Sequence, residues 1–177
     1  MRQIIMCLTV LILLLTWSST AKAQQQKGDR EIFASFSINV PEKGDGTATG
    51  VLKYGQYQTD NINAGLLTIT SFSKNFSSLS MGIYGGYSLL MGTKYVPYAN
   101  ALIIYTTTNT DVPGGTSVST NTGLVGGEAG VKYYFAEYAA VDFSAQYQTQ
   151  LFGDKGSGSL MRYLIGISVL LPRKDRK

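Results

Sequence analysis

Residues 139–149 read AAVDFSAQYQT, and residues 159–171 read SLMRYLIGISVLL. In the first stretch Val141, Phe143 and Ala145 alternate with the polar residues Asp142 and Ser144. Successive side chains of a β-strand point to opposite faces, so this alternation predicts strands with one apolar and one polar face. The same two-residue period recurs in segment after segment from residue 31 to residue 171, which predicts an all-β chain.

The alternating segments divide into eight predicted strands joined by turns. Their ranges are 31–40, 47–57, 62–71, 78–89, 96–107, 122–135, 139–149 and 159–171. Short connections are expected near residues 60–61, 92–93 and 137, and longer polar ones near 43–44, 74–75, 109–119 and 153–158. Short turns on one side and longer loops on the other are typical of outer-membrane barrels. The sequence therefore predicts an eight-stranded antiparallel up-and-down transmembrane β-barrel.

The first 23 residues have the three parts of a secretory signal peptide. Arg2 precedes an apolar stretch over residues 4–17, and residues 21–23 read AKA, a typical cleavage site. An uncleaved membrane anchor is the alternative, but the stretch is shorter than the ~20 apolar residues that a spanning helix needs. We expect a signal peptide over 1–23 and an outer-membrane β-barrel domain over 24–177, which ends in the short basic tail RKDRK.

The composition argues against an enzyme. The chain contains no histidine, and its one cysteine, Cys7, lies in the predicted signal peptide. Histidine is the commonest general base and the commonest neutral metal ligand. We therefore predict no catalytic residues, no cofactor and no metal site. The net positive charge comes from the signal peptide and the tail, and the rest of the chain is about neutral without a cluster of Lys and Arg, so no nucleic-acid partner is predicted either.

Five charged residues lie on the polar faces of the predicted strands: Lys53, Glu128, Lys132, Asp142 and Arg162. A Lys or Arg that faces lipid at mid-membrane costs ~2–4 kcal/mol, so these side chains are expected inside the barrel. An eight-stranded barrel is just wide enough for its own side chains to fill, which predicts a paired charge network that plugs the lumen. A narrow pore lined by the same charges is the alternative.

The partners within this network are predicted from strand order. Asp142 and Arg162 lie on the seventh and eighth strands, which are adjacent, so they are the expected direct contact. Glu128 and Lys132 lie four residues apart on one strand, roughly 13 Å by the rise of a strand. Both are therefore expected to pair with neighbouring strands instead of with each other.

Two other features of the sequence carry predictions. The Ser- and Thr-rich segment 106–122, which begins at Thr106 and ends at Thr122, is predicted to be the longest external loop. Such loops bind surface ligands, although a mobile loop without a partner is equally consistent with its composition. The strand ends YGQY (54–57), YGGY (84–87) and KYYF (132–135) predict an aromatic girdle at the membrane interface.

The stretches YQTDNINAG (57–65) and GVKYYFAEY (130–138) resemble the aromatic–turn–aliphatic–Gly hairpins of small outer-membrane barrels of the OmpX and OmpA-transmembrane type. This resemblance covers the predicted mature chain and implies a porin-like outer-membrane β-barrel domain. Members of that family usually end the last strand on an aromatic residue that aids recognition by the insertion machinery. Here the last strand ends on Val169, Leu170 and Leu171.

The sequence predicts a non-enzymatic barrel in a bacterial outer membrane, with a structural or surface-interaction role through its external loops. Its expected partners are outer-membrane lipid, the insertion machinery during biogenesis, and a surface ligand at segment 106–122. A narrow channel for ions or small solutes is the first alternative. The second is a soluble periplasmic barrel that binds lipid, in which the apolar face would point inward.

Overall fold

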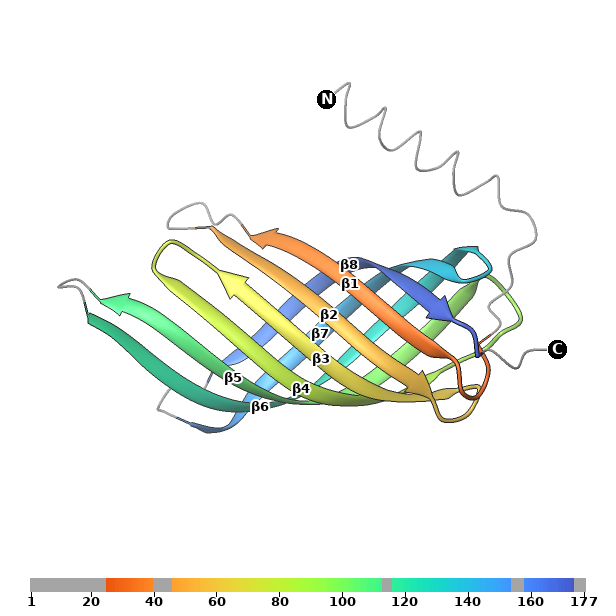
Figure 1. The fold of residues 1–177 in the computed structure, drawn as a ribbon, viewed down its shortest axis with the longest axis horizontal. Coiled ribbons are helices and arrows are strands. Elements are labelled where there is room, and N and C mark those ends of the chain that lie inside the picture. The colour runs from red at the N-terminus through yellow and green to blue at the C-terminus, as the bar shows by residue number, and fades with distance from the viewer. Residues whose placement is uncertain (1–24, 40–45, 113–115, 154–157, 174–177) are drawn as a thin grey trace, which may run out of the picture.

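The computed structural model describes residues 25–39, 46–112, 116–153 and 158–173 of the 177-residue chain. The strands are β1 (Arg30–Asn39), β2 (Thr47–Tyr57), β3 (Ile62–Phe72), β4 (Phe76–Ser88), β5 (Tyr95–Val112), β6 (Thr116–Ala136), β7 (Ala139–Gly153) and β8 (Ser159–Leu171). Each strand pairs antiparallel with the next, and β8 pairs with β1, so the sheet closes into a barrel (Figure 1). The predicted fold class is confirmed.

Among the described residues, the structure contains no helix with the length and the apolar composition that a membrane span needs.

The barrel has two distinct ends. We call the end where β1 begins and β8 ends the terminal end, and the other the distal end (Figure 1). At the terminal end the chain turns between β2 and β3, between β4 and β5, and between β6 and β7. These three turns lie where the sequence predicted them. In the first, Thr59 Oγ1 accepts a hydrogen bond from the backbone N–H of Ile62 at 3.0 Å.

The segment 106–122 is mostly strand, and its prediction as a loop is wrong. β5 continues to Val112 and β6 begins at Thr116, so the two strands form a ribbon that projects beyond the other hairpins at the distal end (Figure 1). Thr is β-branched and favours extended backbone, which outweighs its polarity here. Asp111 and Ser117 form a cross-strand hydrogen bond of 2.8 Å near the tip.

The expected contrast between short and long connections is also wrong in part. The β3–β4 connection, predicted to be long, spans only residues 73–75. The connections near 43–44 and 154–157 lie outside the described residues. Within the described chain, the distal end is therefore extended by the long strands β5 and β6 more than by a loop.

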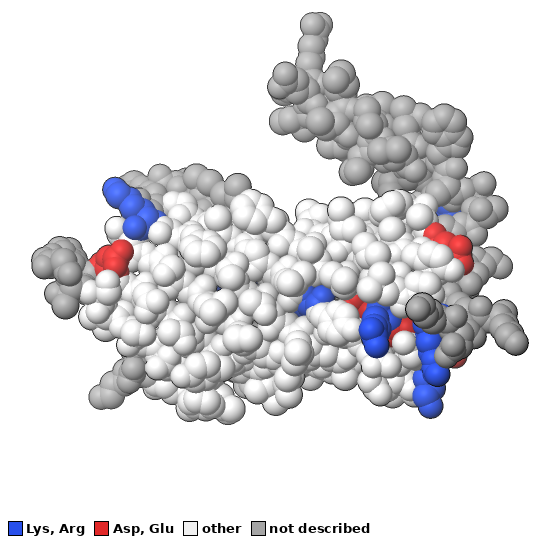
Figure 2. Space-filling view, in the orientation of Figure 1, with Lys and Arg blue, Asp and Glu red and all other residues white. Residues whose placement is uncertain are grey.

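The outer face of the barrel is apolar. Large outward side chains around its middle include Leu52, Leu66, Met81, Ile83, Ile103, Phe143, Ile165 and Ile167, and all of them are exposed. Figure 2 shows that charged side chains on the visible face lie mostly near the two ends of the barrel, with a wide uncharged band between them. A barrel with its apolar face inside is therefore not the arrangement of this chain.

The predicted aromatic girdle is wrong in part, because successive side chains of a strand point alternately outward and into the lumen. In YGQY and YGGY the two tyrosines are three residues apart, an odd spacing that puts them on opposite faces of a strand. Tyr54 and Tyr87 face outward and are exposed, whereas Tyr57 and Tyr84 point into the lumen and are buried. Half of the expected girdle is thus part of the interior.

Glycines on the inner face make room for the inward tyrosines and amides. A Cβ atom on Gly55 would lie 2.2 Å from the hydroxyl oxygen of Tyr84. A Cβ atom on Gly86 would lie 1.8 Å from Oδ1 of Asn100. Both distances are far below van der Waals contact, so these two positions need glycine for the lumen to hold large side chains.

The strand pairs differ greatly in length. β5 and β6 are matched over all 18 residues of β5, from Tyr95 to Val112. β1 and β8, which close the barrel, are matched only from Arg30 to Ser35 of β1. The closing seam is therefore the shortest pairing in the barrel.

Candidate functional site in the barrel lumen

The lumen near the terminal end holds a cluster of charged side chains, and Lys53 and Glu128 are at its centre. Nζ of Lys53 on β2 donates to both carboxylate oxygens of Glu128 on β6, at 2.6 and 2.8 Å. Glu128 Oε2 also accepts from Nδ2 of Asn100 at 3.1 Å. The Lys53 ammonium lies 4.1 Å from the centroid of the Phe33 ring, close enough for a cation–π contact.

A second ion pair lies beside the first. Nζ of Lys132 on β6 donates to Oε2 of Glu31 on β1 at 2.7 Å. The hydroxyl of Tyr57 donates to the same carboxylate at 2.9 Å, and the hydroxyl of Ser168 donates to its other oxygen. Glu31 is only 4% exposed, so these donors replace water around a fully desolvated carboxylate.

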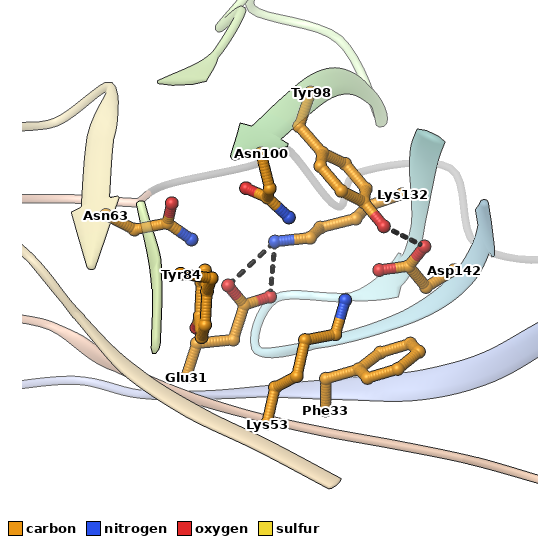
Figure 3. Close-up of a pocket in the computed structure, with 9 residues that line it drawn as sticks. All are labelled: Glu31, Phe33, Lys53, Asn63, Tyr84, Tyr98, Asn100, Lys132 and Asp142. Carbon is orange, nitrogen blue, oxygen red and sulfur yellow. Dashed lines mark hydrogen bonds and ion pairs between the residues drawn. The ribbon is translucent and has the colours of Figure 1, made fainter. Parts of the chain in front are cut away.

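Asp142 completes the cluster through Tyr98 (Figure 3). The Tyr98 hydroxyl lies 2.8 Å from Oδ1 of Asp142 and 3.3 Å from Oε1 of Glu128. A phenol has one proton to donate, and the shorter distance assigns it to Asp142. Asp142 is also the cross-strand partner of Lys132, so its carboxylate lies next to both ion pairs.

Four of the five predicted residues lie in this cluster, and Arg162 does not. Arg162 is the cross-strand partner of Gln146, whereas Asp142 is opposite Gly166. Gln146 is four residues from Asp142 along β7, which separates the two by roughly 13 Å. The predicted direct contact between Asp142 and Arg162 is therefore wrong. Arg162 Nη1 has no hydrogen-bond partner among the described residues.

The expected partners of Glu128 and Lys132 are also corrected. The two do not pair with each other, as expected, but neither forms its ion pair with a neighbouring strand: the ion partners lie on β2 and β1, whereas β6 is hydrogen-bonded to β5 and β7. Both ion pairs cross the lumen. The strands of an eight-stranded barrel are tilted and staggered, so side chains from opposite walls can meet at one level.

The sequence prediction did not include Glu31, Tyr57 or Tyr98 in the charge network. Glu31 is the first residue of the predicted strand 31–40 and shares the face of Ser35, so its position in the alternation already placed it inside. Tyr98 carried no such signal, because no inner face was predicted for its strand. Its role depends on two carboxylates from β6 and β7 that only the folded barrel brings together.

The lumen is filled at two levels. The cavity among the charged side chains measures about 10 Å³, near the lower limit for one water molecule. Next to it lies a layer of buried apolar side chains: Phe33, Val51, Leu67, Ile69, Tyr84, Leu102, Ile104 and Leu164. The sequence did not predict this apolar layer. Charged and apolar side chains thus occupy two neighbouring levels of the lumen.

The chemistry of this cluster is that of paired charges. Three carboxylates, those of Glu31, Glu128 and Asp142, face the ammonium groups of Lys53 and Lys132. Each carboxylate accepts at least one hydrogen bond from a lysine or a tyrosine. Among the described residues, no group of three or more potential metal ligands is close enough to hold an ion.

A closed antiparallel barrel with an apolar outer face and a filled, charged lumen has the architecture of the small outer-membrane β-barrels. Solved structures of that class are similar to this chain along most of its length. Neisserial surface protein A matches with a TM-score of 0.63 and 15% identity, over 80% of this chain and 95% of that one.

Two barrels from Pseudomonas aeruginosa are similar to the same degree. The N-terminal β-barrel domain of OprF matches with a TM-score of 0.63 and 18% identity, over 84% of this chain and 100% of that domain. The outer membrane protein OprG matches with a TM-score of 0.61 and 15% identity, over 83% and 97%. These likenesses confirm the resemblance in fold to the OmpA and OmpX type.

No family model matches the sequence. No curated protein matches it either.

Proposed function

We propose that this chain is a non-enzymatic protein of a bacterial outer membrane, with a structural or surface-interaction role. The observation that carries the proposal is the combination of an apolar outer face with a lumen filled by its own side chains. The apolar face suits a lipid environment, where a closed barrel satisfies every backbone hydrogen bond. The filled lumen leaves the external surface as the part that can meet a partner.

The β5–β6 ribbon is the part of that surface best suited to an interaction. Both of its strands continue past the ends of β4 and β7, so residues 117–121 of β6 have one edge that no strand of the described chain pairs with. Ser117, Ser119 and Asn121 are exposed along it, and Val118 is 52% exposed. A rigid polar ribbon with a free edge presents hydrogen-bonding groups to a surface ligand at low entropic cost.

A narrow channel remains the second candidate, because the cluster in the lumen holds five charged residues. The same residues favour a plug, since the two ion pairs and the apolar layer occupy its cross-section. Conductance in a planar bilayer separates the two functions. A plugged barrel gives no steady current, whereas open events that change with Glu128→Gln would favour the channel.

The location is tested by fractionation of cells that express the full chain. We expect the protein in the outer-membrane fraction, as a band that migrates faster before boiling than after it. A soluble protein in the periplasm would reject the proposal.

The exposure of the ribbon is tested by labelling of single cysteines on intact cells. If the signal peptide is removed with Cys7, the remaining chain has no cysteine. We expect Ser119→Cys on the ribbon to react with a membrane-impermeant maleimide. Glu137→Cys, in the turn at the terminal end, should react only after the cells are permeabilised, and the reverse result would invert the topology.

A further inference from the structure

A hollow on the outer surface lies outside the lumen, at the terminal end of the closing seam. Its volume is about 370 Å³, within the range of roughly 300–1,000 Å³ that small-ligand sites occupy. It is lined by Gly28, Arg30, Gln56, Leu171, Pro172 and Arg173. Two arginines line it, and none of the described residues that line it is acidic. The chemistry of the hollow therefore fits an anion.

The strand register sets this hollow against the edge of the apolar surface. Arg30 is the cross-strand partner of both Gln56 on β2 and Leu171 on β8. The next outward residue of β1 is Ile32, whose partners are Tyr54 and Val169, and all three are exposed. The hollow thus lies directly beyond the row of Ile32, Tyr54 and Val169, on the side toward the terminal end. An amphiphile could place its charged group in the hollow and its chains along that row.

The walls of the hollow are held in place by the fold. The backbone N–H of Arg173 donates to Oδ1 of Asp29 at 3.1 Å, and that of Gly28 donates to the carbonyl of Tyr57 at 2.8 Å. Gly28 has a φ of +91°, and a Cβ atom there would lie 3.0 Å from Cδ of Arg173. The glycine lets the arginine side chain lie against the backbone, so the cationic wall is formed before any ligand arrives.

Arg30 is the guanidinium of the hollow that is available to a ligand. Its side chain is exposed and makes no hydrogen bond or ion pair within the described part of the chain. Guanidinium groups match the geometry of phosphate oxygens with two parallel hydrogen bonds. The Gln56 side chain, on the neighbouring strand, adds an amide donor.

We propose that this hollow binds the phosphate headgroup of an anionic phospholipid in the membrane leaflet next to the terminal end, with acyl chains along Ile32, Tyr54 and Val169. The proposal rests on the proposed location in a membrane and adds a specific lipid site to it. The ligand must span the boundary between the apolar band and water, which a phospholipid does and a free phosphate does not.

The test is native mass spectrometry of the refolded chain in detergent with added phosphatidylglycerol or phosphatidylcholine of the same acyl chains. The wild type should retain phosphatidylglycerol in preference to phosphatidylcholine. Arg30→Gln should weaken that retention about fivefold, the effect of roughly one basic residue at an anionic surface. Lys74→Gln is the matched control, because Lys74 is an exposed cation at the distal end.

The outcomes are distinguishable. Equal retention by the wild type and Arg30→Gln, or an equal loss in Lys74→Gln, would overturn the site. Displacement of phosphatidylglycerol by millimolar inorganic phosphate would assign the hollow to a free anion and overturn the lipid proposal. A gel shift on heating shows that each variant is folded. Absence of the protein from the membrane fraction of cells would instead reject the proposed location.

Discussion

Lys53 and Glu128 lie on opposite walls of the barrel, yet their side chains meet in the lumen with Nζ 2.6 Å from Oε1. Their strands, β2 and β6, are not neighbours in the sheet. The ion pair therefore connects two walls that the backbone hydrogen bonds do not connect. Both residues are buried, so its strength depends on the interior of the folded barrel.

Breaking this pair on one side should be more harmful than replacing both residues. Glu128→Gln leaves a buried ammonium without its carboxylate, and such a change typically costs ~3–5 kcal/mol. The double change Glu128→Gln with Lys53→Met should recover part of that loss. Urea titration of the folded band on unboiled gels measures the free energy of unfolding. Losses that simply add would show that the two residues do not interact.

Asp142 should couple to Tyr98 and not to Arg162. Tyr98→Phe removes the hydroxyl that donates to Asp142, and a hydrogen bond to a charged group contributes ~1.5–3 kcal/mol. A double-mutant cycle of Tyr98→Phe and Asp142→Asn should give a clear interaction energy. The matched cycle of Asp142→Asn and Arg162→Gln should be additive within ~0.5 kcal/mol. Strong coupling in the second cycle would restore the contact between Asp142 and Arg162.

The apolar outer face should reject charge only where it meets lipid. Ile165 faces outward and is 61% exposed, and Ile165→Arg should cost ~2–4 kcal/mol if the side chain lies near the membrane midplane. Val118 is 52% exposed but lies on the projecting ribbon, so Val118→Arg should change stability by less than ~0.5 kcal/mol. Refolding into lipid vesicles, followed by urea titration, compares the two. Equal losses would place the ribbon in the membrane as well.

Export should remove residues 1–23, which lie outside the described residues. The AKA site over residues 21–23 predicts Gln24 as the first residue of the mature protein. Intact-mass measurement of protein purified from the cell envelope checks this, including a form in which Gln24 has cyclised. A mature protein that still begins at Met1 would contradict it.

The parts of the fold that the sequence predicted well are the strands with an apolar outer face and a face that lines the lumen. β2 and β8 begin and end at the predicted residues. The ribbon was missed because it projects beyond the barrel and carries mostly polar residues, so apolar and polar residues no longer alternate. The β-branched residues of the segment, among them Thr106, Thr107 and Thr108, were the signal for a strand there.

The sequence predicted most of the charged residues that lie in the lumen, but it did not predict which of them form ion pairs. The alternation of a strand states which side chains point inward, and it placed Lys53, Glu128, Lys132 and Asp142 in the lumen. Which of them meet depends on the stagger of all eight strands, a property of the closed barrel that no local pattern contains. For the same reason the partner of Lys132 proved to be Glu31, a hundred and one positions away in the chain.

The short pairing between β1 and β8 is expected to form last when the barrel assembles. It joins residues near the start of the domain to residues near its end, whereas each of the other pairings joins consecutive strands. Contacts between distant parts of a chain form late, because the loop between them must first lose its freedom. We therefore expect residues 30–35 to pair with β8 as the last step of assembly. Under mechanical force or heat, the same six residue pairs should be the first to separate.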